Sequence, residues 1–320
     1  MADTLSILQA LSTEHFTSGA ALAERFQCSR ATISGALALS ETYGIALERK
    51  HGVGYRLIPK VDWLDQRQLQ AQLATNSQLQ IRCTGITDST NRQLLQNPGH
   101  GLALAAEWQT AGRGRRGRNW QGQIGSSLLF SLCWQFDGGP SQLAGLPLVV
   151  GLSVAQTLAR LGVQDIALKW PNDLLLPMGH GWGKVGGILI EMQGDALGPS
   201  LVVIGIGLNV LAPPADVDQQ ASSLSGAGLG CTRNALLANL LQGLEQQLLQ
   251  FAQDGFTDAL IRQWESRHAW QGCEVEALLA NGSRQRGKAV GLSADGNLRL
   301  ATGAEEILLG SGDVSLRQSA

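Results

Sequence analysis

The chain has 320 residues, with 24 Lys plus Arg against 26 Asp plus Glu, a formal net charge of −2. Charged residues make up 16% of the chain and hydrophobic residues 44%, and the 40 glycines follow no fixed period. These values exclude collagen, a coiled coil and wholesale disorder. At roughly 100 to 200 residues per domain, the length predicts two or three domains with their own cores.

The apolar stretches do not predict a membrane span. Residues 143–155 and 201–210 are the longest, but Gly, Pro, Ser or Asn interrupts them and both fall short of the roughly 20 residues that a span needs. Asp3 and Glu14 lie where an export signal would carry a basic end. We therefore expect a cytoplasmic protein with no membrane partner.

Cysteine and histidine are scattered. The five cysteines include no CxxC pair and the five histidines no HExxH, which disfavours a protein-ligated metal and favours reduced structural thiols.

Residues 1–60 predict a winged helix-turn-helix domain. A short helical pattern around Leu5 is followed by two helices that Ser18 and Ser29 can cap, with a tight turn between them. Two short alternating runs at 45–49 and 55–57, joined by a glycine-containing turn, then predict a hairpin, the wing.

This first domain has six basic and five acidic residues, a weak footprint for a nucleic-acid-binding domain. The placement of its polar side chains still favours DNA, and docking or dimerisation is the alternative. The residues predicted to contact DNA are Ser29, Arg30, Thr32 and Ser34 on the second of the two capped helices, and Arg49 and Lys50 on the wing.

Three further segments follow. Residues 61–75 predict a polar, Gln-rich helix, within a linker over 61–80. Residues 81–270 mix strand-like and helical runs in a half-regular order, which favours an α/β domain with a mixed sheet. Residues 271–320 alternate short strands with Asn-Gly and Asp-Gly turns, typical of a small β-barrel. The fold class expected is thus α+β with several domains.

The most unusual segment is GRGRRGRNW at residues 112–120, which we call the arginine loop. It contains GxGxxG, but neither a helix start nor an acid about twenty residues later follows in the arrangement that a dinucleotide-binding fold needs. Its guanidinium groups suit phosphate or carboxylate. An anion site is therefore predicted, against a nucleic-acid loop or a solvated surface loop as alternatives.

Two strings downstream also indicate a site. KWPND at 169–173 presents an amide and a carboxylate after a strand, and GKVGGIL at 183–189 places a lysine beside glycines. Taken singly, Lys169, Asp173 and Lys184 could equally form a structural ion pair. No P-loop or esterase motif occurs.

Together with DSTN at 88–91, Gln109 and GIGLN at 205–209, these strings resemble the biotin protein ligases, and the winged helix resembles the bifunctional form that also represses the biotin operon. The resemblance covers nearly the whole chain and implies an SH3-like C-terminal barrel. It implies that biotin and ATP form biotinyl-5'-AMP, with Mg²⁺ bound through the ATP phosphates. Biotin would then pass to a lysine of a biotin carboxyl carrier protein of acetyl-CoA carboxylase.

By the same resemblance, Lys184, Arg113 and Arg115 would be catalytic. The residues implied to bind biotin are Ser89, Thr90, Asn91, Gln109, Arg113, Gly114, Arg115, Lys184, Gly187 and Leu189. Those implied to bind the nucleotide are Arg116, Arg118, Trp120, Asn172 and Asn209. The role of Asp173 stays open.

The adenylate would also act as corepressor by favouring a homodimer that binds operator DNA. Two alternatives remain. One is a non-catalytic, biotin-sensing repressor, which the retained Arg113, Arg115, Lys184 and Asn172 disfavour. The other is a ligase for another acid such as lipoate, against which the arginine loop speaks.

Overall fold

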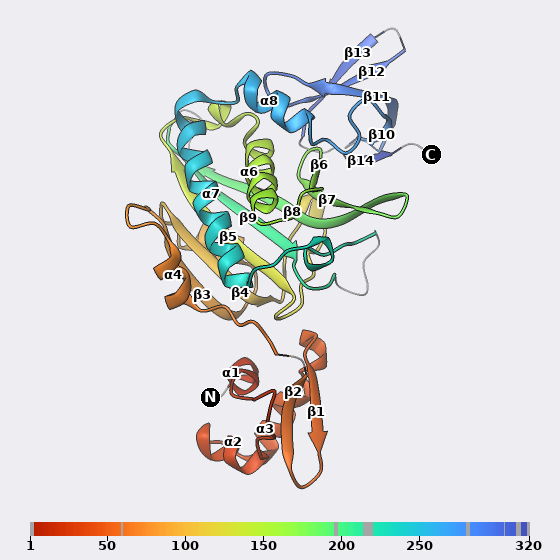
Figure 1. Cartoon of the computed structure of the whole chain (residues 1–320). Helices are drawn as coiled ribbons and strands as arrows, with labels where there is room; N and C mark the ends of the chain where they lie inside the picture. Colours follow the sequence, from red (N-terminus) through yellow and green to blue (C-terminus); the bar gives the residue numbers. More distant parts are fainter. Residues whose placement is uncertain are drawn as a thin grey trace.

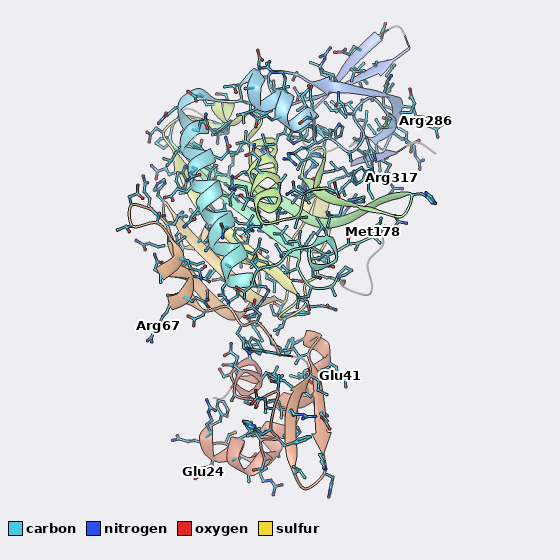
Figure 2. The ribbon with its side chains drawn as sticks, in the orientation of Figure 1. Glu24, Glu41, Arg67, Met178, Arg286 and Arg317 are labelled. Carbon is cyan, nitrogen blue, oxygen red and sulfur yellow. The ribbon has the colours of Figure 1, made fainter. Side chains whose placement is uncertain are left out.

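The computed structural model describes residues 3–58, 60–194, 198–213, 220–279, 282–303, 305–311 and 315–318. Three units follow one another along the chain: a small N-terminal unit, a central sheet covered by helices and a C-terminal sheet (Figure 1). Charged side chains such as Glu24, Arg67 and Arg286 project from the rim of these units (Figure 2).

Among the described residues the α-helices are α1 (Thr4–Gln9), α2 (Gly19–Arg25), α3 (Arg30–Ala38), α4 (Gln66–Gln72), α5 (Thr90–Gln96), α6 (Leu146–Arg160), α7 (Arg233–Asp254) and α8 (Asp258–Glu265). The strands are β1 (Ala46–Lys50), β2 (Gly54–Ile58), β3 (Gln80–Thr87), β4 (Leu102–Gln109), β5 (Ser127–Phe136), β6 (Ala167–Lys169), β7 (Asp173–Met178), β8 (Gly181–Gly194), β9 (Ser200–Asn209), β10 (Glu274–Leu278), β11 (Arg284–Leu292), β12 (Leu298–Thr302), β13 (Glu305–Leu309) and β14 (Ser315–Gln318).

The N-terminal unit is the predicted winged helix. Ser18 and Ser29 cap α2 and α3, because their hydroxyls accept the backbone N–H of Ala21 and Thr32. Strands β1 and β2 pair antiparallel as the wing. Ile33 and Leu37 of α3 are fully buried in this unit's own core.

The predicted 61–75 helix is shorter in the structure, because Asp65 caps α4 through the N–H groups of Arg67 and Gln68. Leu69 of α4 is fully buried in the central core, so this helix packs as part of the central unit.

A buried ion pair anchors the segment that joins the first two units. Arg233, at the start of α7, lies 2.7 Å from Glu107 of β4, and both side chains are almost completely buried. Arg233 Nε also donates to the Asp62 carbonyl (2.9 Å), and Glu107 accepts the Leu64 N–H (2.7 Å). Removing one partner would leave a buried charge uncompensated, which costs about 3–5 kcal/mol.

The central sheet is mixed, as predicted. Among the described residues its seven strands run in the order β3-β4-β5-β9-β8-β7-β6, and only β3 and β4 are parallel. Helices α6 and α7 lie side by side across one face (Figure 1). Alternate residues of β9, including Ile204, Ile206 and Leu208, enter the core beneath them.

One segment among the described residues is long and apolar enough to cross a membrane by length and composition alone. It is Pro140–Arg160, but 72% of its most apolar window is buried inside the protein. It contains α6, whose apolar residues cover the sheet.

The C-terminal unit is an antiparallel sheet in the order β13-β12-β11-β10-β14. A small β-barrel is expected from the sequence. Among the described residues, the edge strands β13 and β14 do not pair with each other, so closure of the sheet is not seen there.

Candidate active site

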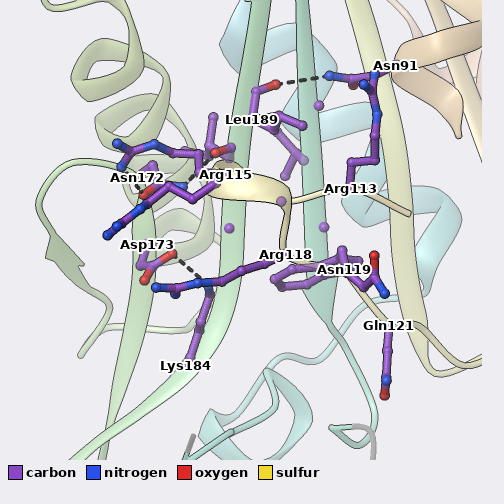
Figure 3. Close-up of a pocket in the computed structure, with 18 of the residues that line it drawn as sticks. Asn91, Arg113, Arg115, Arg118, Asn119, Gln121, Asn172, Asp173, Lys184 and Leu189 are labelled. Carbon is purple, nitrogen blue, oxygen red and sulfur yellow. Dashed lines mark hydrogen bonds and ion pairs between the residues drawn. The ribbon is translucent and has the colours of Figure 1, made fainter. Parts of the chain in front are cut away.

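A cleft of about 850 Å³ lies on the sheet face opposite α6 and α7. The start of α5, the arginine loop and strands β8 and β9 form its walls (Figure 3), and residues of β14 also line it. The sequence-predicted ligand residues that line it are Ser89, Thr90, Asn91, Gln109, Arg113, Gly114, Arg115, Arg116, Arg118, Trp120, Asn172, Lys184, Gly187, Leu189 and Asn209. The fold thus brings together all of the residues predicted to bind biotin or nucleotide, and their individual roles stay predictions.

Glycines on the cleft face of the sheet make room for its side chains. A Cβ atom on Gly207 of β9 would lie 2.3 Å from the Trp120 ring, and one on Gly205 would lie 2.2 Å from Asn91 Oδ1. Gly187 of β8 pairs with Gly207 and also lies against Trp120. The alternation of β9 therefore places apolar residues in the core and glycines in the cleft.

A β-bulge directs Lys184 into the cleft. Leu174 pairs with Gly186 and Leu175 with Lys184, which leaves Val185 without a partner across β7. The extra residue lets Lys184 and Gly187, three positions apart, face the same side. The Lys184 ammonium then lies 5.4 Å from the centre of the Trp120 ring.

Asp173 joins two lysines. Its carboxylate is 2.7 Å from the Lys184 ammonium and 3.6 Å from that of Lys169, and all three side chains are mostly buried. Burial lowers the pKa of Lys169, an effect that Asp173 opposes and Lys184 and Arg118 reinforce. The ion pair left open by the sequence is therefore present, and it lies inside the cleft.

Two asparagines hold the cleft wall in place. Asn172 Nδ2 donates to the Ile188 carbonyl (2.8 Å), and its Oδ1 accepts a hydrogen bond from Arg115 Nη1 (3.1 Å). Asn209 Nδ2 donates to the backbone carbonyls of Lys184 and Ser222, whereas its buried Oδ1 has no partner among the described residues. The Asn209 oxygen can thus accept from a ligand.

The arginine loop closes on itself. The N–H of Gly114 donates to the Arg118 carbonyl (2.7 Å), and that of Trp120 to the Gly112 carbonyl (2.9 Å). Arg116 adopts a positive φ of 58° in the turn between them. A Cβ on Gly112 would lie 2.4 Å from the Trp120 carbonyl, whereas one on Gly114 would make only ordinary contacts. Gly112 is therefore the glycine that lets the two ends of the loop, residues 112 and 120, lie close together.

The C-terminal unit reaches this loop. Arg115 Nη2 donates to the Ser311 carbonyl, and Leu316 and Arg317 of β14 line the cleft. The sequence did not predict a role for Arg317, because nothing in a short strand of the C-terminal unit indicates a contact with the central unit.

The other end of the cleft is neutral. The Gln109 side-chain oxygen accepts from both the N–H (2.7 Å) and the hydroxyl (3.0 Å) of Thr90. This fixes the Gln109 amide so that its Nε2 remains as a donor. Ser89 caps α5 through the Arg92 N–H. Hydrogen bonds from Gln93, the Ser89 N–H, Arg92 and Thr87 lower the pKa of the adjacent Asp88 to about 2.

The predicted DNA contacts lie apart from the cleft, on α3 and the wing. Arg30 and Ser34 are exposed on α3. The hydroxyls of Ser29 and Thr32 are hydrogen-bonded to each other, and Arg49 Nη2 donates to the Leu37 carbonyl at the end of α3 (2.8 Å). Lys50 is exposed on the wing.

Within the described ranges, no group of three or more His, Cys, Asp or Glu side chains could hold a metal ion.

Sequence and structure comparisons agree on one kind of protein. Residues 82–209 match the biotin/lipoate A/B protein ligase family, residues 4–56 a helix-turn-helix domain and residues 272–317 the biotin protein ligase C-terminal domain. The chain is 35% identical over 267 residues to the bifunctional ligase/repressor BirA of Escherichia coli, across 82% of this chain and 81% of that protein. It is 34% identical over 263 residues to the biotin–[acetyl-CoA-carboxylase] ligase of Mycobacterium tuberculosis, across 78% and 95% of the two chains.

Among solved structures, the biotin protein ligase from Aquifex aeolicus in complex with biotin and ATP is similar with a TM-score of 0.64 and 32% identity. That match covers 75% of this chain and 99% of the other.

Proposed function

This chain belongs to the biotin protein ligases, in the group of bifunctional ligase/repressors, and from that premise we propose how its cleft acts. The protein is an ATP-dependent biotin ligase with an N-terminal helix-turn-helix domain. The cleft itself supports the assignment of biotin-binding and ATP-binding roles to its residues. It has a neutral end at Gln109 and Thr90 and a cationic end at Lys184 and Arg115.

In the first step, a biotin carboxylate oxygen attacks the α-phosphorus of ATP, and the bond to pyrophosphate breaks. Two anions must approach in line, so the protein has to offset their repulsion and hold their geometry. Lys184 and Arg115 would supply most of the positive charge, and Arg113, which is paired with Glu191, a smaller part. Ser89, Thr90 and Gln109 would bind the neutral part of biotin, and Gly187 and Leu189 would line its pocket.

The nucleotide would occupy the side of the cleft that holds Trp120. The Trp120 indole rests on glycines of β8 and β9, and its buried Nε1 has no partner in the part of the chain that the structure describes. We place adenine against this ring, and Asn172, Asn209, Arg116 and Arg118 near the phosphates. Mg²⁺ would enter with ATP and be held by the phosphates.

In the second step, the ε-amine of an acceptor lysine attacks the acyl carbonyl of biotinyl-5'-AMP. AMP leaves, and the amine loses its proton to solvent. A mixed anhydride hydrolyses in water, so a closed loop over the adenylate protects it until the acceptor arrives. The acceptor would be a biotin carboxyl carrier protein in the cytoplasm.

The winged helix would give the adenylate a second use. We infer that the adenylate-bound protein forms a homodimer that places two winged helices on operator DNA and represses biotin synthesis genes. Such a switch requires the ligand to bind the dimer-competent state more tightly than the other state. Arg30, Thr32 and Ser34 would face the bases, with Ser29, Arg49 and Lys50 near the phosphates.

The direct test incubates the purified chain with labelled biotin and MgATP, measures adenylate, and then adds a biotin carrier domain. Label on the acceptor lysine is the expected result. Tight biotin binding without adenylate would instead make the chain a biotin-sensing repressor. An excess of unlabelled lipoate serves as the specificity control and should not compete. Operator binding and sedimentation, with and without adenylate, test repression and dimerisation separately.

A further inference from the structure

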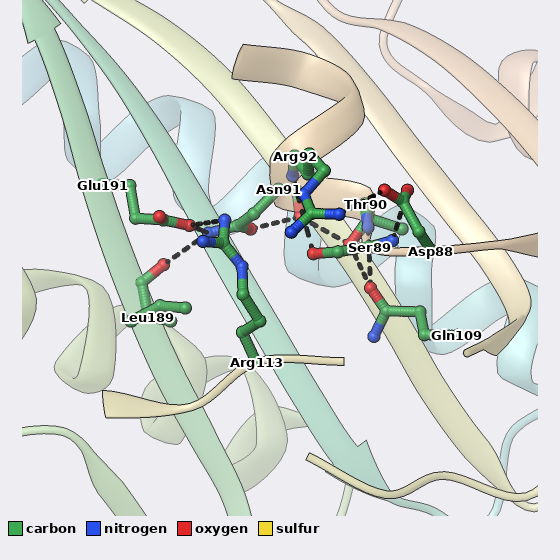
Figure 4. A network of polar contacts seen from close by, with 10 residues as sticks. Asp88, Ser89, Thr90, Asn91, Arg92, Gln109, Arg113, Leu189 and Glu191 are labelled. Carbon is green, nitrogen blue, oxygen red and sulfur yellow. Dashed lines mark hydrogen bonds and ion pairs between the residues drawn. The ribbon is translucent and has the colours of Figure 1, made fainter. Parts of the chain in front are cut away.

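A chain of polar contacts runs beneath the neutral end of the cleft and returns to the segment on which it starts (Figure 4). In order, it passes through Gln109, Thr90, Ser131, Asn91, Glu191 and Arg113. Its two ends are four residues apart, on the segment that leads from β4 into the arginine loop. The contacts therefore form a ring that joins this segment to α5, β5 and β8.

Glu191 of β8 is the acid in this ring. Its Oε2 accepts from Arg113 Nη2 (2.8 Å) and from Asn91 Nδ2 (2.8 Å). The side chains of Arg113 and Glu191 are 35% and 25% exposed. Solvent therefore screens this pair less than it would a pair on the open surface.

Glu191 also determines how the Asn91 amide is oriented. Asn91 Nδ2 faces two acceptors, the Glu191 carboxylate and the Leu189 carbonyl (3.3 Å). Its Oδ1 therefore faces the Ser131 hydroxyl, which lies 2.5 Å away and is fully buried. If Asn91 turned over, two partly buried acceptors and a buried hydroxyl would lose good partners.

The Ser131 hydroxyl also contacts Thr90, one of the residues predicted to bind biotin. Because the one Ser131 proton goes to Asn91, the Thr90 hydroxyl, 2.7 Å from Ser131 Oγ, can donate its own proton to Ser131, while the Thr90 N–H donates to Gln109 (2.7 Å). The glycine at position 205 leaves the space that Asn91 occupies. Thr90, Gln109 and Arg113 thus depend on contacts that meet at Asn91 and Glu191.

The ion pair changes the expected role of Arg113. Because Glu191 compensates the Arg113 charge, this guanidinium is anchored to β8. The positive charge that faces the triphosphate then comes chiefly from the other end of the cleft, where Lys169 and Lys184 share the single carboxylate of Asp173.

Building on the proposed function, we propose that Glu191 is a positioning residue for biotin. It fastens the start of the arginine loop to β8 through Arg113, and through Asn91 and Ser131 it sets the hydroxyl and amide groups that bind the neutral part of biotin. It acts through these residues, and the adenylation chemistry at Lys184 does not depend on it.

The test compares wild type, Glu191→Ala, Glu191→Gln and Ser131→Ala in steady-state adenylation and in stopped-flow biotin binding. The matched control is Gln193→Ala, since Gln193 is exposed two residues further along the same face of β8. Glu191→Ala should raise the KM for biotin and the biotin dissociation rate roughly 10- to 100-fold, the range for loss of hydrogen bonds to a charged group. The kcat and the KM for ATP should change less than about threefold.

The other variants grade the effect. Glu191→Gln keeps an acceptor for Asn91 and should recover part of the biotin affinity, and Ser131→Ala should shift the biotin KM in the same direction. Gln193→Ala should match wild type. A wild-type KM for biotin in Glu191→Ala would overturn the proposal. So would a fall in kcat and a rise in the KM for ATP as large as the change in the KM for biotin, because a merely structural residue would produce that pattern. If the wild type itself forms no adenylate, the proposed function fails and this inference fails with it.

Discussion

The Asp173 carboxylate lies 2.7 Å from the Lys184 ammonium, inside a cleft whose other titratable side chains are mostly basic. The two residues come from neighbouring strands, β7 and β8. The same carboxylate is 3.6 Å from Lys169, so one anion serves two cations. Asp173 therefore both orients Lys184 and limits the net positive charge inside the cleft.

Asp173→Asn tests this arrangement. Without the Asp173 charge, the ammonium groups of Lys169 and Lys184 are less compensated, so ATP should bind as tightly as before or more tightly. Lys184, however, loses the partner that orients it. We expect kcat for adenylation to fall roughly 10-fold, with the KM for ATP unchanged or lower. A raised ATP KM with normal kcat would contradict the assignment.

Lys184→Ala should retain the fold and slow adenylation by a factor of about 10² or more, because the charge that stabilises the developing anion is gone. Single-turnover formation of adenylate is the measurement. Lys288→Ala is the control, since Lys288 is an exposed lysine on β11. Near-normal adenylation by Lys184→Ala would remove Lys184 from the chemistry.

Arg115→Gly should release the adenylate early. The Arg115 side chain joins the arginine loop to Asn172 and to the Ser311 carbonyl, and the substitution removes both contacts. We expect the lifetime of bound adenylate, followed by trapping released label, to shorten roughly 10-fold. An unchanged lifetime would count against a closing role for this loop.

Gly207→Ala should displace Trp120, because the added Cβ would lie 2.3 Å from Trp120 Cε2. Overpacking of this kind costs about 1–3 kcal/mol, so the KM for ATP should rise roughly 10-fold. Gly35→Ala is the matched control: Gly35 lies in α3, and a Cβ there has nothing within 4 Å. That variant should keep wild-type ligation, and a normal ATP KM in Gly207→Ala would mean that Trp120 does not contact the nucleotide.

His268 should make the protein less stable in acid. Burial lowers its pKa from 6.5 to about 4, and a hydrogen bond with Gln271 only partly opposes this shift. The unfolded chain binds a proton at higher pH than the folded chain, so this contribution is fully present above pH 6.5 and is lost as the pH falls from 6.5 to about 4. The expected loss is about 3 kcal/mol in the free energy of unfolding.

Denaturant titrations across that pH range test the effect. His268→Phe should flatten the acid limb, because the ring can still pack against Trp264 without titrating. His180→Gln, at an exposed histidine, should retain the wild-type pH dependence. Identical profiles for His268→Phe and wild type would contradict the assignment.

Local patterns in the chain determined the kind of protein and most of its elements. Capping at Ser18 and Ser29 predicted α2 and α3, and the alternating runs at 45–49 and 55–57 predicted the wing strands β1 and β2. Three strings could be recognised locally, because each has several charged or polar residues and glycines close together: the arginine loop, KWPND and GKVGGIL. The ligand residues predicted from them all line one cleft.

Long-range packing decided the rest. The bulge at Val185 turns Lys184 into the cleft, and no local pattern predicts a bulge that depends on pairing with β7. Ser131 and Glu191 lie in strands where a single polar residue has no distinctive neighbours, yet the sheet brings them to Asn91 across 40 and 100 positions. Local sequence preferences therefore determine the helices and loops. The partners of each side chain depend on strand order and register, and only the folded sheet determines these.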